Sequence, residues 1–428
     1  MPHFLTTVRS KEDLETIQLK GLQWTCRHAY EGSPFYRKRF DDAGIGLEDI
    51  RSLEDLQRLP FTTAADLQEQ YPWPLRSVPF EKIVRIHASS GTTGKRKVMV
   101  YTAKDIDDWA DMFARCYATA GLSRADRVQI CVGYGVWTAG VGFQLGCERF
   151  GAMAVPVGPG NIDMQMQFLV DFQPTVLCAT ASMALLLAEE VDKRGLGNKV
   201  AVKKVIFGAE RSTDAMRSKI RELFGAEHTF DIPGLTEAYG PGTGLDCQLH
   251  QGIHYWADYY ILEVLNPETL APVRNGEVGE MVYTTLRKEG APLIRYRSRD
   301  LTRLISGDCP CGSLFPRHDR ILGRSDDMFI VRGVNIYPGH VDEILAAEKG
   351  IGSEYQIHLD RKEDGKDYMT VLVERASDGD PLADEPLSRK IERDLRKELL
   401  VSGAVKIVRY GSLPRTDRKT KRVFDNRD

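Results

Sequence analysis

The segment HASSGTTGK (87–95) combines glycines, hydroxyl side chains and a lysine at the point where an apolar run ends. Glycines allow backbone N–H groups to approach an anion closely, and the hydroxyl groups and the lysine ammonium add further donors. This composition predicts a phosphate-binding loop, with a plain turn between two strands as the alternative. The predicted loop residues are Ser89, Ser90, Gly91, Thr92, Thr93, Gly94 and Lys95.

The loop does not fit the common P-loop pattern G-x-x-x-x-G-K-[ST]. Counting back from Gly94, the position of the first glycine is occupied by Ser89. The residue after Lys95, which should offer a hydroxyl group to magnesium, is Arg96. The sequence therefore predicts a phosphate loop of another class.

Four more segments follow at a distance: GLTEAYGPG (234–242), YRSRD (296–300), GRSDDMFIVRG (323–333) and LPRTDRKTKRV (413–423). With SSGTTGKRKVMVYT (89–102), they resemble in order the signature segments of the adenylate-forming superfamily, which includes the acyl-CoA synthetases. CRHAYEGSPFYRKRFDDAGI (26–45), LPFTTAADLQEQYP (59–72) and VRIHASSGTTGK (84–95) are similar to the phenylacetate–CoA ligase family. This resemblance covers essentially the full chain.

The resemblance implies a two-step reaction that uses ATP, magnesium and coenzyme A. An aryl-acetic or related aromatic acid would react with ATP to give an acyl-adenylate and pyrophosphate, and the thiol of coenzyme A would then displace AMP. Two alternatives remain open at this point. One is an adenylating enzyme that delivers the acyl group to a carrier protein, and the other is a catalytically silent nucleotide-binding regulator.

The resemblance assigns roles to charged residues of the nucleotide site. Lys95 would contact the β- and γ-phosphates of ATP, and Glu237 would bind Mg²⁺, which prefers oxygen ligands. Asp300 would accept hydrogen bonds from the ribose, and Arg324 would contact the nucleotide. The alternatives are a charge at a helix N-terminus for Glu237, an ion pair with a neighbouring arginine (Arg297 or Arg299) for Asp300, and a salt bridge for Arg324.

Lys419 is the predicted catalytic cation, because adenylation requires positive charge where negative charge develops on phosphate. Lys421 is the competing lysine, and a solvated basic tail is the alternative to both. Asp326 is the predicted hinge at which a mobile C-terminal domain rotates and withdraws Lys419 before coenzyme A enters.

Other loop residues are expected to shape the two binding sites. The acid would lie against Tyr134, Gly135, Val136, Trp137 and Gly234, and the nucleotide against Gly208, Ala209, Glu210, Asp231, Pro233 and Thr236. Many members of the superfamily carry an aromatic residue just before the Gly-Leu-[Ser/Thr]-Glu segment, where it stacks on adenine. In this chain that position is Pro233, which has a flat apolar face but no π-system.

Three cysteines and a histidine could form a metal site. CPCG (309–312) places two thiols close together, and Cys247 and His254 lie upstream. Cys and His side chains satisfy tetrahedral zinc, so a structural zinc site of Cys247, His254, Cys309 and Cys311 is predicted, with unpaired buried thiols as the alternative.

These residues need a scaffold, and the pattern of the chain predicts an α/β fold. A helix is expected over residues 11–30 with Ser10 as its N-cap, and another after Thr102. From 81 to 240, short apolar strands alternate with helical stretches, which predicts parallel βαβ units. A β-rich part follows at about 253–305. We expect a large domain over 1–323 and a small mobile α+β domain over 324–428.

Composition narrows the functional classes further. The 428 residues carry a net charge of −3, which argues against a nucleic-acid-binding protein. No apolar run reaches the roughly 20 residues of a membrane span, and the first residues lack the apolar stretch of a signal peptide. The eight cysteines are therefore expected to be reduced thiols in a cytoplasmic protein, and the resemblance adds a homodimer.

Overall fold

The structure, a computed structural model, describes residues 8–89, 95–136, 139–210, 212–332, 334–361, 366–376, 379–414 and 421–427. The chain divides into two compact units. The first consists of Met1–Ala209 and Phe224–Ile321, and the second of Glu210–Leu223 and Leu322–Asp428. Each unit has a hydrophobic core of its own.

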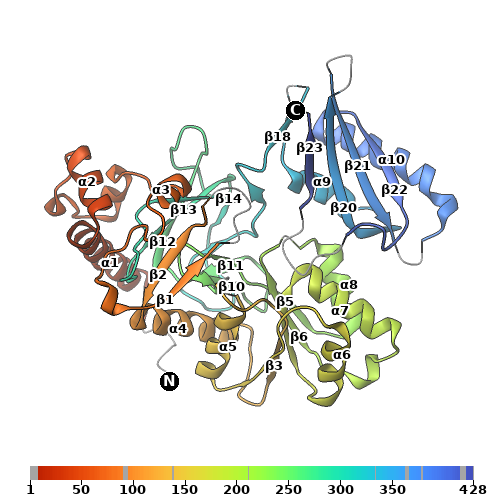
Figure 1. The fold of residues 1–428 in the computed structure, drawn as a ribbon, viewed down its shortest axis with the longest axis horizontal. Coiled ribbons are helices and arrows are strands. Elements are labelled where there is room, and N and C mark those ends of the chain that lie inside the picture. The colour runs from red at the N-terminus through yellow and green to blue at the C-terminus, as the bar shows by residue number, and fades with distance from the viewer. Residues whose placement is uncertain are drawn as a thin grey trace. The chain divides into compact units, whose positions relative to one another are not determined.

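The first unit begins with helices that pack on its core (Figure 1). These are α1 (Lys11–Gly32), α2 (Pro34–Ala43) and α3 (Ala64–Glu69). The Ser10 side chain accepts a hydrogen bond from the backbone N–H of Asp13, so the predicted N-cap is confirmed.

Strands β1 (Ile83–Ala88) and β2 (Val98–Thr102) form an antiparallel pair and a sheet of their own. The expectation of parallel units throughout 81–240 was wrong for this pair. The reason is chain length, because a parallel connection needs a crossover of a dozen or more residues and only residues 89–97 separate these strands.

Strand β2 leads directly into α4 (Ala103–Thr119), as predicted from Thr102. The Thr102 hydroxyl accepts a hydrogen bond from the Asp105 N–H (3.2 Å), and the Asp105 carboxylate accepts one from the Thr102 N–H (3.0 Å). The Thr102 hydroxyl also donates to the carboxylate of Glu289. This reciprocal cap fixes the start of α4 beside the segment that follows strand β13.

Replacing Thr102 with alanine should lower the free energy of unfolding by about 1–2 kcal/mol, because an N-cap side chain is lost. The shift of the urea midpoint measures this. The control is Thr16→Ala, since Thr16 is exposed and its hydroxyl bonds the Glu12 carbonyl within α1 rather than a helix end. Equal losses in the two variants would contradict the capping role.

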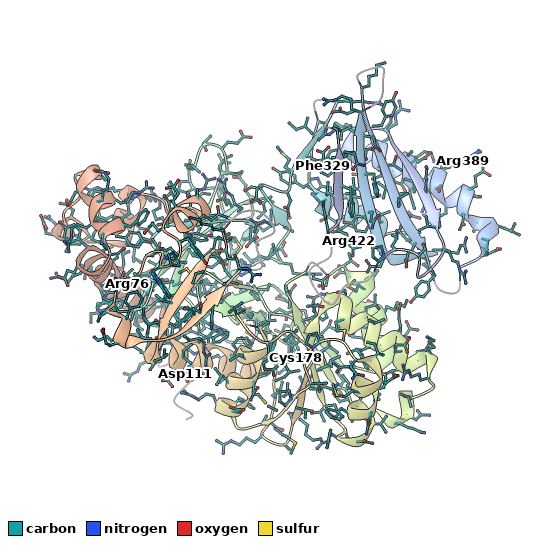
Figure 2. All side chains as sticks on the ribbon, viewed as in Figure 1. Arg76, Asp111, Cys178, Phe329, Arg389 and Arg422 are labelled. Atoms are coloured by element: carbon teal, nitrogen blue, oxygen red, sulfur yellow. The ribbon has the colours of Figure 1, made fainter. Side chains whose placement is uncertain are left out.

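A five-stranded parallel sheet forms the centre of the first unit, as the alternation predicts, in the order β4-β3-β5-β6-β7. Helices α5 and α7 pack against it, and Cys178, labelled in Figure 2, lies on β5. The elements are β3 (Arg127–Ile130), α5 (Ala139–Phe150), β4 (Met153–Pro156), α6 (Ile162–Asp171), β5 (Val176–Thr180), α7 (Ala181–Lys193), β6 (Lys204–Gly208) and β7 (His228–Asp231).

The β-rich part of the first unit contains short strands and longer antiparallel ones. Strands β12, β13 and β14 pair antiparallel, and β10, β11, β16 and β15 form a four-stranded sheet. Their bounds are β8 (Gly234–Leu235), β9 (Gly240–Pro241), β10 (Gly244–Asp246), β11 (Ile253–Tyr255), β12 (Tyr260–Leu265), β13 (Gly279–Thr285), β14 (Tyr296–Thr302), β15 (Leu304–Ile305) and β16 (Arg317–His318).

The second unit has the predicted α+β character. Its sheet has the order β22-β21-β20-β23, and α9 and α10 pack on each other and on strands of this sheet (Figure 1). Its elements are α8 (Asp214–Phe224), β17 (Gly323–Arg324), β18 (Phe329–Val331), β19 (Val334–Ile336), α9 (Pro338–Ala346), β20 (Ile351–Arg361), β21 (Asp367–Arg375), α10 (Asp384–Leu399), β22 (Gly403–Val408) and β23 (Val423–Asn426). Within the described residues, no helix combines the length and apolar character of a membrane span.

Candidate active site

The loops at the carboxyl ends of β3, β6 and β7 lie at one edge of the parallel sheet, because parallel strands end on the same side. The chain goes to β4 on one side of β3 and to β5 on the other, so β3 is a switch point where ligands commonly bind. The backbone N–H of Ala88 donates to the carbonyl of Val136 (2.9 Å). This bond joins the end of β1, which precedes the phosphate loop, to the loop after β3.

Glu237 is the buried carboxylate of this site, with its side chain 2% exposed. It lies in a tight turn between β8 and β9, so the alternative of a helix N-terminus was wrong. The ammonium group of Lys97 forms an ion pair with the Glu237 carboxylate, and the Tyr296 hydroxyl donates to its Oε1 (3.0 Å). An anion this deeply buried requires such partners.

The sequence predicted Lys95 as the lysine of the phosphate loop. In the structure, the lysine that pairs with the Glu237 carboxylate is Lys97. Lys95 is exposed, and its Nζ lies 5.6 Å from the centre of the Tyr71 ring. Lys97 lies two residues beyond Lys95 in the segment that leads into β2, and the sequence alone did not distinguish the two lysines. Ser89 is half-buried and its N–H bonds the Lys97 carbonyl, whereas Ser90, Gly91, Thr92, Thr93 and Gly94 lie outside the described residues.

Backbone hydrogen bonds hold the segment on either side of Glu237. The N–H of Asp231 donates to the Asp246 carboxylate (2.9 Å), and the Pro233 carbonyl accepts from the Gly242 N–H (3.0 Å). The Thr236 carbonyl accepts from the Tyr101 hydroxyl (3.0 Å). Gly234 has no room for a side chain, because a Cβ there would lie 2.1 Å from the Cα of Pro241. The turn that carries Glu237 is therefore tightly fixed.

Arg297 and Arg299 are the arginines that the ion-pair alternative assigned to Asp300. Both Arg297 and Arg299 pair with the buried carboxylate of Glu280, at 2.8 and 3.5 Å. Asp300 is half-buried on β14, and its N–H bonds the Ser298 hydroxyl (3.1 Å). The arginines are thus engaged on another carboxylate.

The loop after β3 carries the predicted acid-binding residues. Tyr134 and Val136 are exposed to 38% and 44%, and Gly135 has a φ of +101°, which favours glycine. Burial raises the pKa of the Tyr134 hydroxyl to about 12, so this group is neutral at pH 7. A Cβ at Gly140 would lie 2.7 Å from the Tyr134 ring, so this glycine makes space for the ring. Trp137 lies outside the described residues.

The Gly208–Glu210 segment begins at the last residue of β6. Gly208 is buried, and Ala209 is exposed with a φ of +68°, an unusual backbone conformation for alanine. Such outliers are common at ligand sites. Glu210 is grouped with the second unit.

In the second unit, Arg324 forms a bidentate ion pair with Asp326, with both N–O distances at 2.9 Å. The predicted hinge residue and the predicted nucleotide contact are therefore partners here, which is the salt-bridge alternative considered for Arg324.

The predicted catalytic residue Lys419 lies outside the described residues, in the segment 415–420. The chain on either side is anchored to buried carboxylates. The Leu413 N–H donates to Glu374 (2.7 Å), and the Arg422 guanidinium donates to Glu354 (2.8 Å). These bonds tie Leu413 and Arg422 to the second unit.

Cys247, His254, Cys309 and Cys311 come together in the first unit, with all their ligand atoms within 4.8 Å of one another. The Sγ atoms of Cys247 and Cys309 are 3.8 Å apart, and Cys311 Sγ is 3.3 Å from His254 Nε2. With Zn–S bonds of about 2.3 Å, two sulfurs of a tetrahedral site lie about 3.8 Å apart. His254 Nδ1 donates to the Phe315 carbonyl (2.9 Å), which leaves the Nε2 lone pair facing the thiols.

Two family models match most of the chain. The AMP-binding enzyme family matches residues 47–285, and the AMP-binding enzyme C-terminal domain matches residues 333–427. The phenylacetate-coenzyme A ligase of Escherichia coli (strain K12) is 40% identical over 425 residues, which cover 98% of this chain and 96% of that protein.

Solved structures give the same result. The crystal structure of 2-hydroxyisobutyryl-CoA ligase in the postadenylation state with 2-HIB-AMP is similar, with a TM-score of 0.91, 29% identity, and 100% and 92% of the two chains covered. The same ligase with 2-HIB-AMP and CoA in the thioesterification state has a TM-score of 0.71, 29% identity and the same coverage.

Proposed function

Since the chain belongs to the phenylacetate–coenzyme A ligase family of AMP-binding enzymes, we propose that it joins an aromatic carboxylic acid of the phenylacetate type to coenzyme A. The enzyme is an ATP-dependent acid–thiol ligase that forms an acyl-adenylate and releases AMP and pyrophosphate. The names of the relatives favour coenzyme A as the acceptor over a carrier protein, and an active ligase over a silent regulator.

The observation that carries the proposal is the buried Glu237 carboxylate, which pairs with Lys97 just after the predicted phosphate loop. Glu237 would hold Mg²⁺, which prefers carboxylate oxygens and phosphate. A cation already occupies this carboxylate, because Lys97 is paired with it. Metal binding would displace the Lys97 ammonium, which would then be free to contact the phosphates together with Lys95 and the loop 89–94.

The remaining site residues receive roles in the same scheme. Asp300 would accept hydrogen bonds from the ribose hydroxyls, and the neutral Tyr134 would lie along the aromatic acid. The nucleotide would lie against Gly208–Glu210 and Asp231–Thr236, with Pro233 beside the adenine.

The two half-reactions need two positions of the C-terminal domain, because Lys419 and the thiol must approach the same carbonyl. We place the mobile domain at 324–428 with its hinge at Asp326. Swinging at this hinge would break the Arg324–Asp326 ion pair, which is half-exposed and therefore costs little to open. Related 2-hydroxyisobutyryl-CoA ligase structures in postadenylation and thioesterification states support such a scheme.

We also propose that Cys247, His254, Cys309 and Cys311 bind one structural zinc ion. Burial lowers the pKa of His254, so its imidazole is neutral and able to bind metal. Four protein ligands fill a tetrahedral shell, and no position is left for a substrate.

A cytoplasmic homodimer completes the proposal. An exposed aromatic group of Tyr71, Trp73 and Phe80, with the last two rings 5.2 Å apart, is a surface that a second copy could cover. Light scattering of the wild type and of Trp73→Ser tests this assignment.

Product analysis tests the function directly. Purified protein is mixed with ATP, Mg²⁺ and a panel of phenylacetates, indoleacetate and benzoates, with and without coenzyme A. AMP and pyrophosphate should form with an aromatic acid, and the thioester should form only when coenzyme A is present. Release of ADP alone, or adenylate formation with no thioester, would overturn the proposal.

Replacing Tyr296 with phenylalanine should raise the Mg²⁺ concentration needed for half-maximal adenylation by about 10–100-fold. Outer-shell partners of metal ligands typically have effects of this size, and the Tyr296 hydroxyl is bonded to Glu237. Pyrophosphate release over a Mg²⁺ titration measures it.

The matched control is Tyr283→Phe. Tyr283 is the cross-strand neighbour of Tyr296 and is equally buried, but its hydroxyl contacts Met281 instead. If both variants change the Mg²⁺ requirement by the same factor, the hydroxyl contact with Glu237 is not the cause.

A further inference from the structure

We propose that Lys288 is a positioning residue for the turn that carries Glu237, and that it acts through the ring and hydroxyl of Tyr101. The inference rests on the proposed role of Glu237 as the metal ligand. It concerns a residue outside every signature segment of the sequence.

Lys288 is completely buried, and its Nζ has no hydrogen-bond partner in the described part of the chain. Lysine is almost never fully buried unless it is paired. Burial lowers the pKa of Lys288 to about 7, while the charges of Asp105 and Glu237 oppose this shift. A lysine in this environment destabilises the fold, so its presence calls for a functional reason.

The backbone around Lys288 is fixed, so its burial is not the result of a loose loop. The Asp105 carboxylate accepts hydrogen bonds from the N–H groups of Glu289 (2.7 Å) and Gly290 (2.8 Å). Gly290 also packs against β2, because a Cβ there would lie 2.4 Å from the Val100 carbonyl oxygen. This anchoring directs the Lys288 side chain into the core.

Aromatic rings surround the buried amine. Lys288 Nζ lies 3.6 Å from the centre of the Tyr101 ring and 5.0 Å from that of Tyr239. Both distances are within the range of cation–π attraction, which is strongest when the groups are desolvated. The His87 ring also lies against Tyr101, with 4.0 Å between centroids. Tyr101 is thus held in one position by its neighbours.

Tyr101 is hydrogen-bonded to the turn that carries Glu237. Its hydroxyl donates to the Thr236 carbonyl (3.0 Å), one residue before Glu237. The path therefore runs from Lys288 to the Tyr101 ring, then through its hydroxyl to the turn between β8 and β9. A side chain that merely filled space would serve the core better if it were apolar, and the amine at this place fits a positioning role.

The test is Lys288→Met, which keeps the length of the side chain and removes its amine. The thermal midpoint should stay equal or rise, because an unpaired buried polar group is lost. The Mg²⁺ concentration needed for half-maximal pyrophosphate release should rise at least tenfold, with little change in the KM of the aromatic acid. A purely structural lysine would move stability and activity in the same direction.

Lys104→Met is the control. Lys104 is also near this segment, but it is partly exposed and paired with Asp108 and the Arg287 carbonyl. This variant should lose stability and keep the wild-type Mg²⁺ requirement.

A double-mutant cycle with Tyr101→Phe tests the path itself, since this change removes only the hydroxyl bond to Thr236. If Lys288 acts through Tyr101, the double variant should lose no more than the worse single variant. Additive losses, or a normal Mg²⁺ requirement in Lys288→Met, would overturn the inference.

Titration calorimetry of Mn²⁺ binding in the presence of ATP measures the metal affinity of the Glu237 turn and does not depend on turnover. If wild type binds Mn²⁺ with ATP but ligates no acid, the proposed function fails, and weaker Mn²⁺ binding by Lys288→Met still supports the inference. Equal Mn²⁺ binding by both proteins overturns it.

Discussion

Lys419→Ala should lower the rate of adenylate formation by about 10²–10³-fold, because one contact to the charge developing on the α-phosphate is lost. Thioester formation from supplied acyl-adenylate and coenzyme A should stay close to wild type, since the proposed domain movement withdraws Lys419 in that step. Pyrophosphate release measures the first half-reaction, and acyl-CoA formation from synthetic acyl-adenylate measures the second.

The control for this variant is Lys421→Ala, because Lys421 is the competing lysine of the same segment. Its Nζ lies 4.9 Å from the ring of Phe424, within the second unit. Only a small effect on either half-reaction is expected. A larger loss in Lys421→Ala would move the catalytic role to that residue, and equal loss of both half-reactions in Lys419→Ala would contradict the domain movement.

Removing the proposed zinc ion should cause the largest loss of stability. Apparent binding free energies of structural zinc sites in peptides reach about 10–16 kcal/mol, and part of this energy stabilises the fold. Wild-type protein should contain one zinc per chain by plasma emission spectroscopy, and Cys309→Ser should contain almost none. The thermal midpoint of the first unit should fall sharply in this variant and in wild type treated with a strong chelator.

Cys131→Ser is the matched control for zinc content, because Cys131 is another buried free thiol and lies outside the cluster. This variant should keep one zinc per chain. Wild-type protein with no zinc and an unchanged midpoint in the chelator would show that the four side chains are buried thiols and a neutral imidazole only.

Local patterns predicted the elements of this fold well. Ser10 and Thr102 marked helix starts because a capping hydroxyl acts on backbone N–H groups only a few residues away. The alternation of strands and helices predicted the parallel sheet. This signal is also local, because the periodicity of apolar residues indicates which face of an element is buried. The antiparallel β1–β2 pair shows the limit, because composition alone does not give strand direction.

The site was only partly predictable. Glu237 was singled out because its segment resembles a family signature, and the structure buries its carboxylate. Cys247, His254, Cys309 and Cys311 were singled out by their metal-binding chemistry, and the structure brings their ligand atoms together. Lys97 and Tyr296 were missed, since a lysine beside a basic segment and a tyrosine in a strand have common solvent-facing or core roles.

By itself, the sequence determined the chemical groups available, the family, and the order of the elements that carry them. Only the tertiary structure decided which groups meet. Lys97 and Tyr296 both contact the Glu237 carboxylate. The two cysteines near residue 310 lie beside Cys247 and His254, and the Lys288 amine lies against the Tyr101 ring. The physical reason is that each of these contacts joins residues far apart in the chain. Its energy depends on burial and distance after packing, and no local pattern records either quantity.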